Sequence, residues 1–239
     1  MKIAVVTTTY KRSDGKTPFF LKRALDSVFN QTHKDFKCFV IGDRYEDDTE
    51  FLNIMSPYDG TKLHFENLPI AMERDNYTDK NLIWKYGGCN ASNYVINIAV
   101  SQGYDYICRI DHDDEWMENH LEVINNVIES KRPLFICTKS FYVGNKILPK
   151  IESDDHLIET YPIGAGMVHS STCVNYGKIP LRQVNLYEEF GRSDKPGDEH
   201  FWNILKSYMI ENNEIGYCVN LVTCSHYEEQ FEKNNLENI

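Results

Sequence analysis

Alternation between strand-like and helix-like segments is the feature that most constrains how this chain folds. Short apolar runs rich in β-branched and aromatic residues are typical of strands, and they occur at 2–7, 36–41, 62–65, 104–111 and 133–138. Apolar residues at helical spacing fill the intervals, over 18–30, 49–55, 91–101 and 115–130. This order predicts an α/β fold with a mainly parallel central sheet flanked by helices.

Polar side chains follow three of the predicted strands. They are Thr9, Asp43 and Asp111. In open α/β sheets, ligands bind beyond the carboxyl ends of the strands. We therefore expect these three side chains to line one polar crevice.

The pattern changes after residue 138. Two short strands, 140–143 and 146–148, are joined by Gly144-Asn145 and predict a hairpin. Further strands are expected at 157–161, 167–169 and 218–224, with a helix that begins at Asp198. The C-terminal portion should therefore be small and antiparallel, whereas the polar segment 67–86 has no clear assignment.

Composition and charge exclude several classes of protein. The chain has 239 residues, enough for one large domain, and its net charge of −11 argues against nucleic acid or an anionic membrane as partner. No apolar run is long enough for a transmembrane segment or signal peptide. Seven cysteines occur without a C-x-x-C pair, which favours a reducing cytoplasm.

Acidic residues gather where the fourth strand ends, at Asp111-His112-Asp113-Asp114-Glu115. In extended backbone, Asp111 and Asp113 would point the same way, roughly 6–7 Å apart, and His112 would point away from both. Several carboxylates at one strand end repel each other unless a cation neutralises them. The spacing therefore suits a hard divalent ion such as Mg²⁺ or Mn²⁺.

A second interpretation of the same stretch is purely structural. Acidic residues are common in turns and at helix starts, and Asp114 with Glu115 fits the start of the helix predicted over 115–130. The residues alone leave both interpretations open.

Five features in order along the chain resemble the inverting glycosyltransferases of the GT-A fold, in particular glycosyltransferase family 2. They are the strand and loop Val5–Arg12, the helix that leads into Gln31-Thr32, the acid Asp43, the segment Gly88–Asn93 with its Gly-x-x-Ala-x-Asn pattern, and the D-x-D motif with an additional acid at Asp111–Asp114. The resemblance covers residues 1 to about 130.

The resemblance implies roles for these residues. Nucleotide contacts would come from Thr9, Tyr10, Arg12, Asp43 and Asp111. A Mn²⁺ or Mg²⁺ ion bridging the two phosphates of the donor would be held by Asp113, with help from Asp111. His226 is a candidate third ligand, since imidazole binds Mn²⁺ beside carboxylates, but it could equally be an exposed histidine after an edge strand.

Two departures from the family pattern bear on catalysis. Asp198-Glu199 resembles the family's Glu-Asp pair with the acids reversed; by position Glu199 would be the general base, although both acids could simply begin a helix. Ser92 stands where many relatives have arginine. The phosphate contact could then come from another cation, among Lys11, Arg12, Arg74 and Lys85.

The expected function is transfer of a sugar. The resemblance implies a metal-dependent hexosyltransferase that uses a nucleotide sugar, preferably a UDP-sugar, and a glycan or lipid-linked acceptor, as in polysaccharide biosynthesis. One domain would span 1–239, with a nucleotide-sugar-binding half at 1–138, an acceptor-binding half at 139–226 and a tail at 227–239.

Two other functions stay open from the sequence. A sugar-phosphate nucleotidyltransferase would ordinarily carry a Gly-rich basic loop after the first strand, and residues 7–16 offer only Gly15. A non-catalytic glycan-binding scaffold would keep the fold but need no metal.

Overall fold

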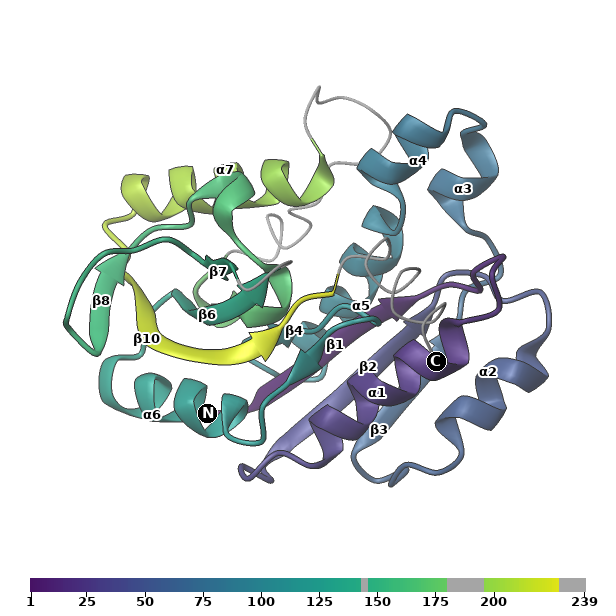
Figure 1. Cartoon of the computed structure of the whole chain (residues 1–239), viewed down its shortest axis with the longest axis horizontal. Helices are drawn as coiled ribbons and strands as arrows, with labels where there is room; N and C mark the ends of the chain where they lie inside the picture. Colours follow the sequence, from purple (N-terminus) through teal and green to yellow (C-terminus); the bar gives the residue numbers. More distant parts are fainter. Residues whose placement is uncertain (143–145, 180–195, 228–239) are drawn as a thin grey trace.

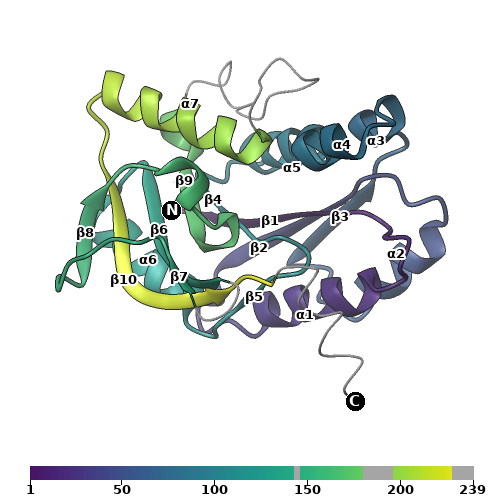
Figure 2. The ribbon, with the colours of Figure 1, turned by 45° about the horizontal axis from the view of Figure 1, so that its top comes forward.

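The protein has three layers, in which one curled, mixed sheet lies between two layers of helices (Figures 1 and 2). The computed structural model describes residues 1–142, 146–179 and 196–227. Within them the strand order is β3-β2-β1-β4-β9-β6-β10-β5, with β7 beside β6 and β8 beside β10.

The first part of the sheet is parallel, as predicted. It contains β1 (Ile3–Thr9), β2 (Phe36–Gly42), β3 (Leu63–Asn67) and β4 (Tyr106–Arg109). β1, β2 and β4 lie buried against helices on both faces, which is the usual environment of parallel strands, whereas β3, at the edge of the sheet, is only partly buried beyond Leu63. Their carboxyl ends bring Thr9, Asp43 and the acidic stretch after β4 to the same edge.

Beyond β4 the sheet becomes mixed. β9 (Thr172–Asn175) lies antiparallel between β4 and β6 (Phe135–Tyr142), and β10 (Gly216–Ser225) runs parallel to β6. Three shorter strands pair antiparallel at the periphery: β5 (Glu115–Trp116), β7 (Lys146–Leu148) and β8 (Leu157–Thr160). The predicted hairpin is confirmed by the pairing of β6 with β7, while its Gly144-Asn145 turn lies outside the described residues.

The strand predicted at 167–169 is wrong. Short 3₁₀ turns form instead, at η1 (Gly164–Gly166) and η2 (His169–Ser171), and another, η3 (Tyr176–Lys178), follows β9. The hydroxyl groups of Ser171 and Thr172 donate to the backbone carbonyls of Val168 and His169, three residues earlier. Such local hydrogen bonds compete with strand pairing, so the chain turns before β9 begins.

Two hydrophobic cores lie on opposite faces of the sheet. Along β1, Ile3 and Val5 face one core and Ala4 and Val6 face the other, because side chains alternate along a strand. The first core is covered by α1 (Thr17–Phe29), α2 (Asp48–Met55) and α6 (His120–Lys131). The second is covered by α5 (Cys89–Ser101) and α7 (Gly197–Glu211) (Figure 2).

The segment 67–86, which the sequence left unassigned, contains two short helices. They are α3 (Met72–Asn76) and α4 (Lys80–Tyr86). Asp79 caps α4 by accepting the backbone N–H of Asn81 at 2.8 Å. α3 places Arg74 at the end of β2, where it joins the site described below.

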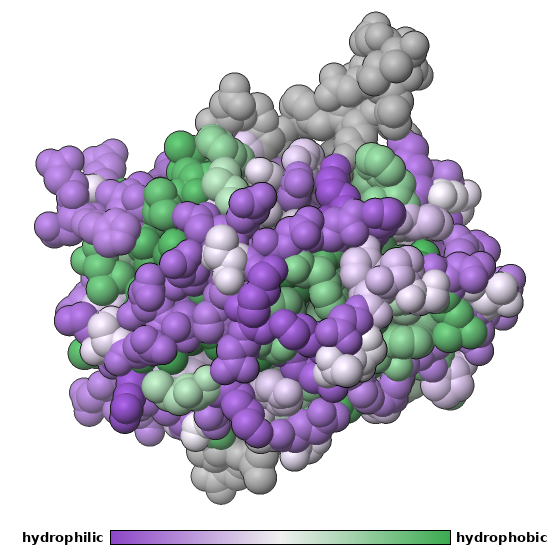
Figure 3. Space-filling view, turned by 90° about the horizontal axis from the view of Figure 1, so that it is seen from below, coloured by the Kyte–Doolittle hydropathy of each residue, from purple (hydrophilic) through white to green (hydrophobic). Residues whose placement is uncertain are grey.

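The surface seen from below in Figure 3 is mostly hydrophilic, with scattered apolar residues. In the part of the chain that the structure describes, no helix combines the length and apolar character needed to cross a bilayer. All seven cysteines are buried free thiols.

Candidate active site

The acidic stretch after β4 forms a tight turn. The Asp114 N–H donates to the carbonyl of Asp111 at 3.1 Å, so the extended backbone expected across Asp113 is wrong. The helix start expected at Asp114 and Glu115 is also wrong, because Glu115 and Trp116 form β5, paired with β10. α6 begins only at His120. The pairing with β10, more than 100 residues away in sequence, could not be read from local pattern.

Asp114 is fully buried and joins three segments. Its carboxylate accepts hydrogen bonds from the Ser170 hydroxyl, from His226 Nδ1 at 3.0–3.1 Å and from the Tyr227 N–H at 3.2 Å. Arg23 of α1 supports the same region, because it donates to the carbonyl of Asp113 and lies 3.9 Å from the ring centroid of Tyr227. The residues after β10 are thereby attached to the acidic turn.

The two acids of the D-x-D motif have opposite protonation tendencies. Burial raises the pKa of Asp111, but the charges of Arg109, His169 and His226, together with a 3.0 Å hydrogen bond from Arg109, lower it to about 2. Burial and the charges of Asp114 and Asp111 raise the pKa of Asp113 to about 7. Asp113 is therefore a carboxylate whose ionisation a cation would favour.

His226 lies directly after β10 and faces the acids. Its ring stacks on Tyr142, with centroids 5.0 Å apart and planes at 9°. Burial lowers the pKa of His226, but the hydrogen bond to Asp114 and the charges of the three acids raise it to about 9. Because Nδ1 is bound to Asp114, Nε2 is the nitrogen left for a metal ion, which would displace its proton.

The protein side chains do not enclose a metal ion by themselves. Among the described residues, no group of three or more His, Cys, Asp or Glu side chains is placed to hold one. The donor set nevertheless fits Mn²⁺ or Mg²⁺, since such ions are commonly held by one or two carboxylates together with the phosphates of a substrate. A bound ion would favour the ionised form of Asp113, whose pKa is raised by desolvation and by the neighbouring acids.

Another part of the site lies at the carboxyl ends of β1 and β2. Arg74 Nε donates to Asp43 Oδ2 at 3.1 Å, and the Arg74 guanidinium lies 4.6 Å from the ring centroid of Tyr10. Burial raises the pKa of Asp43, against the charge of Arg74. Asp43 Oδ1 is buried and has no hydrogen-bond partner among the described residues, so a ligand N–H would satisfy it.

The other residues predicted to contact the nucleotide already interact with protein side chains. Thr9 Oγ1 lies 2.8 Å from the Tyr45 hydroxyl, and the Arg12 guanidinium binds Asp14 with a shortest distance of 2.8 Å. His112 is buried and packs edge-on against Tyr10, with ring centroids 5.5 Å apart.

Arg109 is a candidate site residue that sequence reasoning missed. From β4 it donates to Ser92 Oγ at 2.8 Å as well as to Asp111, so a guanidinium lies beside the position where many relatives have arginine. The signal was present in the sequence: Arg109 and Asp111 are two residues apart at a strand end, and a lone arginine in an apolar strand is unusual. Lys11, by contrast, pairs with Glu50 at 2.5 Å.

The candidate bases lie at the start of α7. Gly197 begins the helix, and Asp198 Oδ1 accepts the backbone N–H of Glu199 at 2.8 Å, which satisfies one of the free amides at a helix start. The Glu199 side chain is half-buried and lies near Gly164. The charges of Asp198 and Asp111 both act on buried His169, so α7 and the acidic turn belong to one electrostatic environment.

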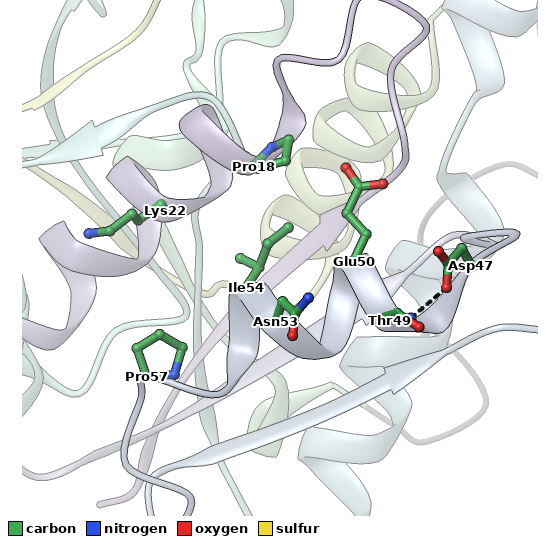
Figure 4. Close-up of a pocket in the computed structure, with 8 residues that line it drawn as sticks. All are labelled: Pro18, Lys22, Asp47, Thr49, Glu50, Asn53, Ile54 and Pro57. Atoms are coloured by element: carbon green, nitrogen blue, oxygen red, sulfur yellow. Dashed lines mark hydrogen bonds between the residues drawn. The ribbon is translucent and has the colours of Figure 1, made fainter.

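A different hollow, of about 500 Å³, lies between α1 and α2. Figure 4 shows its lining, with Pro18 and Lys22 on one helix and Glu50, Asn53 and Ile54 on the other. None of the candidate site residues lines it, and none of its lining atoms is a buried polar group without a partner among the described residues. It is a groove between two packed helices.

A curled mixed sheet covered by helices on both faces, with acids after β2 and β4, is the architecture of the GT-A class of glycosyltransferases. The model of the family described as "Glycosyl transferase family 2" matches residues 4–191, and the chain belongs to this family. The predicted fold and the predicted enzyme class are thereby confirmed, in preference to the nucleotidyltransferase and scaffold alternatives.

Related proteins agree with this assignment. A protein described as an uncharacterized glycosyltransferase from Acanthamoeba polyphaga mimivirus is 32% identical over 244 residues, covering 98% of this chain and 97% of that protein. S. aureus TarS shares the fold: a fragment in complex with UDP aligns with a TM-score of 0.70 at 15% identity, over 95% of this chain and 60% of the fragment. The same fragment with UDP-GlcNAc aligns with a TM-score of 0.67 at 15% identity, over 96% of this chain and 59% of that one.

Proposed function

We propose that this glycosyltransferase is metal-dependent and inverting, and that it moves a hexose from a UDP-sugar to a glycan or lipid-linked acceptor. The observation that carries the proposal is the acidic turn, where the half-buried carboxyl of Asp113 has its pKa raised to about 7 by desolvation and by the charges of Asp114 and Asp111. Such a group at the carboxyl edge of a sheet suits a cation bound together with donor phosphates.

The residues that would hold Mn²⁺ or Mg²⁺ are Asp113 and His226, with Asp111 beside them. When bound, the ion supplies positive charge to the diphosphate oxygens as the sugar–phosphate bond breaks. Asp111, kept ionised by Arg109, is free to assist the ion or to accept a ribose hydroxyl. Arg109 adds a fixed positive charge on the same side of the sheet.

Inversion needs one base on the acceptor side of the anomeric carbon. In our proposal Glu199 accepts the proton of the acceptor hydroxyl as the hydroxyl oxygen attacks the anomeric carbon. The Glu199 side chain is half-buried, whereas the Asp198 carboxylate already accepts the Glu199 backbone N–H. Asp198 is then the acid that orders the first turn of α7. A single displacement with one base inverts the anomeric configuration.

The Asp43–Arg74 pair supports a uracil-containing donor. One carboxylate oxygen is taken by Arg74, which leaves one buried acceptor for one N–H. Uracil presents a single ring N–H between two carbonyl oxygens, so N3–H would bind Asp43 Oδ1. Guanine offers adjacent N–H groups that would need both oxygens of the carboxylate.

Replacing Asp43 with alanine is expected to weaken UDP binding by about 10–100-fold, the effect of losing a hydrogen bond to a charged group of about 1.5–3 kcal/mol. Calorimetric titration with UDP and Mn²⁺ measures it. Glu46→Ala is the matched control, because it removes an exposed carboxylate from the same loop. Equal UDP affinity in Asp43→Ala and wild type would exclude the base contact.

A panel of nucleotide sugars, each with and without Mn²⁺, tests the proposal as a whole. Ligands that bind the native state raise its free energy of unfolding, by about 2.7 kcal/mol at a concentration of 100 Kd. We expect UDP-sugars to raise the melting temperature only with Mn²⁺, and donor hydrolysis to follow the same dependence. Equal shifts with and without metal would contradict the metal-dependent mechanism.

We also propose that the protein acts in the cytoplasm. Seven buried thiols without a disulfide are consistent with a reducing compartment.

A further inference from the structure

A continuous hydrogen-bonded connection links two of the residues proposed to lie at the metal. The Asp111 N–H donates to Ser170 Oγ at 2.9 Å, and the Ser170 hydroxyl donates to Asp114 Oδ2. The same Asp114 carboxylate receives His226 Nδ1 at 3.0–3.1 Å. The connection therefore runs from the backbone of the acidic turn, through η2, to the imidazole after β10.

Asp114 itself is unsuited to bind the metal. It is 0% exposed. Its two oxygens already accept hydrogen bonds from the Ser170 hydroxyl, from His226 Nδ1 and from the Tyr227 N–H at 3.2 Å. A fully buried carboxylate that has three donors has little capacity for a further ligand. Its hydrogen bonds instead hold the Ser170 hydroxyl, the His226 ring and the Tyr227 backbone in place.

The imidazole of His226 is restrained from two directions. The Asp114 carboxylate holds Nδ1, and Tyr142 stacks on the ring face at 5.0 Å. A carboxylate at Nδ1 keeps a proton on that nitrogen, so Nε2 is the nitrogen that would give up its proton and bind a metal.

We propose that Asp114, supported by Ser170, is a positioning residue that fixes the tautomer and ring orientation of His226 for the bound cation. This inference rests on the proposed function and deepens it, because it assigns the third acid of Asp111–Asp114 a task distinct from coordination. Partners that orient metal-binding histidines typically contribute about 10–100-fold to metal affinity.

The test is Mn²⁺ binding in the presence of UDP, followed by the electron paramagnetic resonance signal of free Mn²⁺, so no turnover is needed. Asp114→Asn replaces one of the two acceptor oxygens with an NH₂ donor, so at least one of the three hydrogen bonds to residue 114 is lost. We expect Mn²⁺ affinity to fall about 10–100-fold with the fold retained. Nitrogen-15 spectra of the metal-free proteins, recorded at a pH where His226 is neutral, should show the remaining proton on Nδ1 in the wild type and shared between Nδ1 and Nε2 in Asp114→Asn.

A double variant separates positioning from the charge of Asp114. If Asp114 acts through His226, then Asp114→Asn added to His226→Ala should cost no further Mn²⁺ affinity beyond His226→Ala alone. Glu115→Gln is the matched control, since it removes the neighbouring carboxylate, whose partner is the Tyr227 hydroxyl, and it should bind Mn²⁺ as wild type does. Ser170→Ala should show a smaller loss that also disappears without His226, and it serves if Asp114→Asn unfolds.

Two results would overturn the inference while leaving the proposed function intact. One is wild-type Mn²⁺ affinity in both Asp114→Asn and Ser170→Ala. The other is a loss that persists at full size in the His226→Ala background, which would mean a general charge effect. Binding of UDP by the wild-type protein without any dependence on Mn²⁺ would instead reject the metal-dependent function, and the inference with it.

Discussion

Replacing Asp113 with asparagine is expected to reduce sugar transfer by about 10³-fold or more. In the proposed mechanism Asp113 is an anionic ligand of the ion, and its loss would remove several kcal/mol of stabilisation from the departing diphosphate. The fold should remain, since asparagine has the shape of aspartate and the turn is held by the backbone hydrogen bond from Asp114 to Asp111. Transfer to a glycan acceptor at saturating Mn²⁺ is the measurement.

Stability gives this variant a second, independent readout. The pKa of Asp113 rises from 3.8 to about 7 on folding, so the native state holds a proton that the unfolded state releases between these values. The metal-free wild-type protein therefore loses stability as pH rises from about 4 to 7, whereas Asp113→Asn lacks this loss. At pH 8 the variant should melt at or above the wild-type temperature.

Glu118→Gln is the control for Asp113→Asn, because it removes an exposed carboxylate from the turn before α6. It should leave both transfer and melting temperature unchanged. Unchanged turnover in Asp113→Asn would remove the central role of the acidic turn, and unfolding of that variant at pH 8 would contradict the assigned electrostatics.

Glu199→Gln is expected to lower kcat by about 10²–10⁴-fold, the usual contribution of a general base. Donor affinity should be unchanged, since the loss falls on proton removal from the acceptor. A kinetic pH profile checks the assignment, because the limb that reports the base should disappear in the variant.

Asp198→Asn is the comparison that decides between the two acids of α7. An asparagine oxygen can still accept the Glu199 N–H, so kcat should fall much less than in Glu199→Gln. Glu211→Gln, at the opposite end of the helix, controls for loss of charge. The reverse order of effects would make Asp198 the base.

Much of the parallel half of the fold is predictable from local pattern. β1, α1, β2, α2, β3, α5 and β4 lie where apolar periodicity put them, with bounds that differ by a few residues. The reason is physical: a strand buried on both faces needs a short, uniformly apolar run, and a helix on a sheet needs one apolar face. Neither requirement depends on distant contacts.

For the candidate site, the sequence indicated residue types that could act there but not their geometry. Asp43 lies at a sheet edge with one buried oxygen without a partner among the described residues, as a binding residue there would. The tight turn at Asp111–Asp114, the burial of Asp114 and the role of Arg109 were not anticipated, because they depend on Ser170, His226 and Ser92, which are distant in sequence.

The sequence by itself determined the class of fold and the presence of acids at the carboxyl ends of β2 and β4, since these follow from local periodicity and from the residues that end each strand. Only the tertiary structure decided the environment of each acid. Asp111 lies beside Arg109, which helps to lower its pKa; Asp113 has its pKa raised to about 7; and Asp114 is buried against His226. Protonation and orientation depend on burial and on neighbouring charges, and those arise only when β4, η2 and β10 pack together.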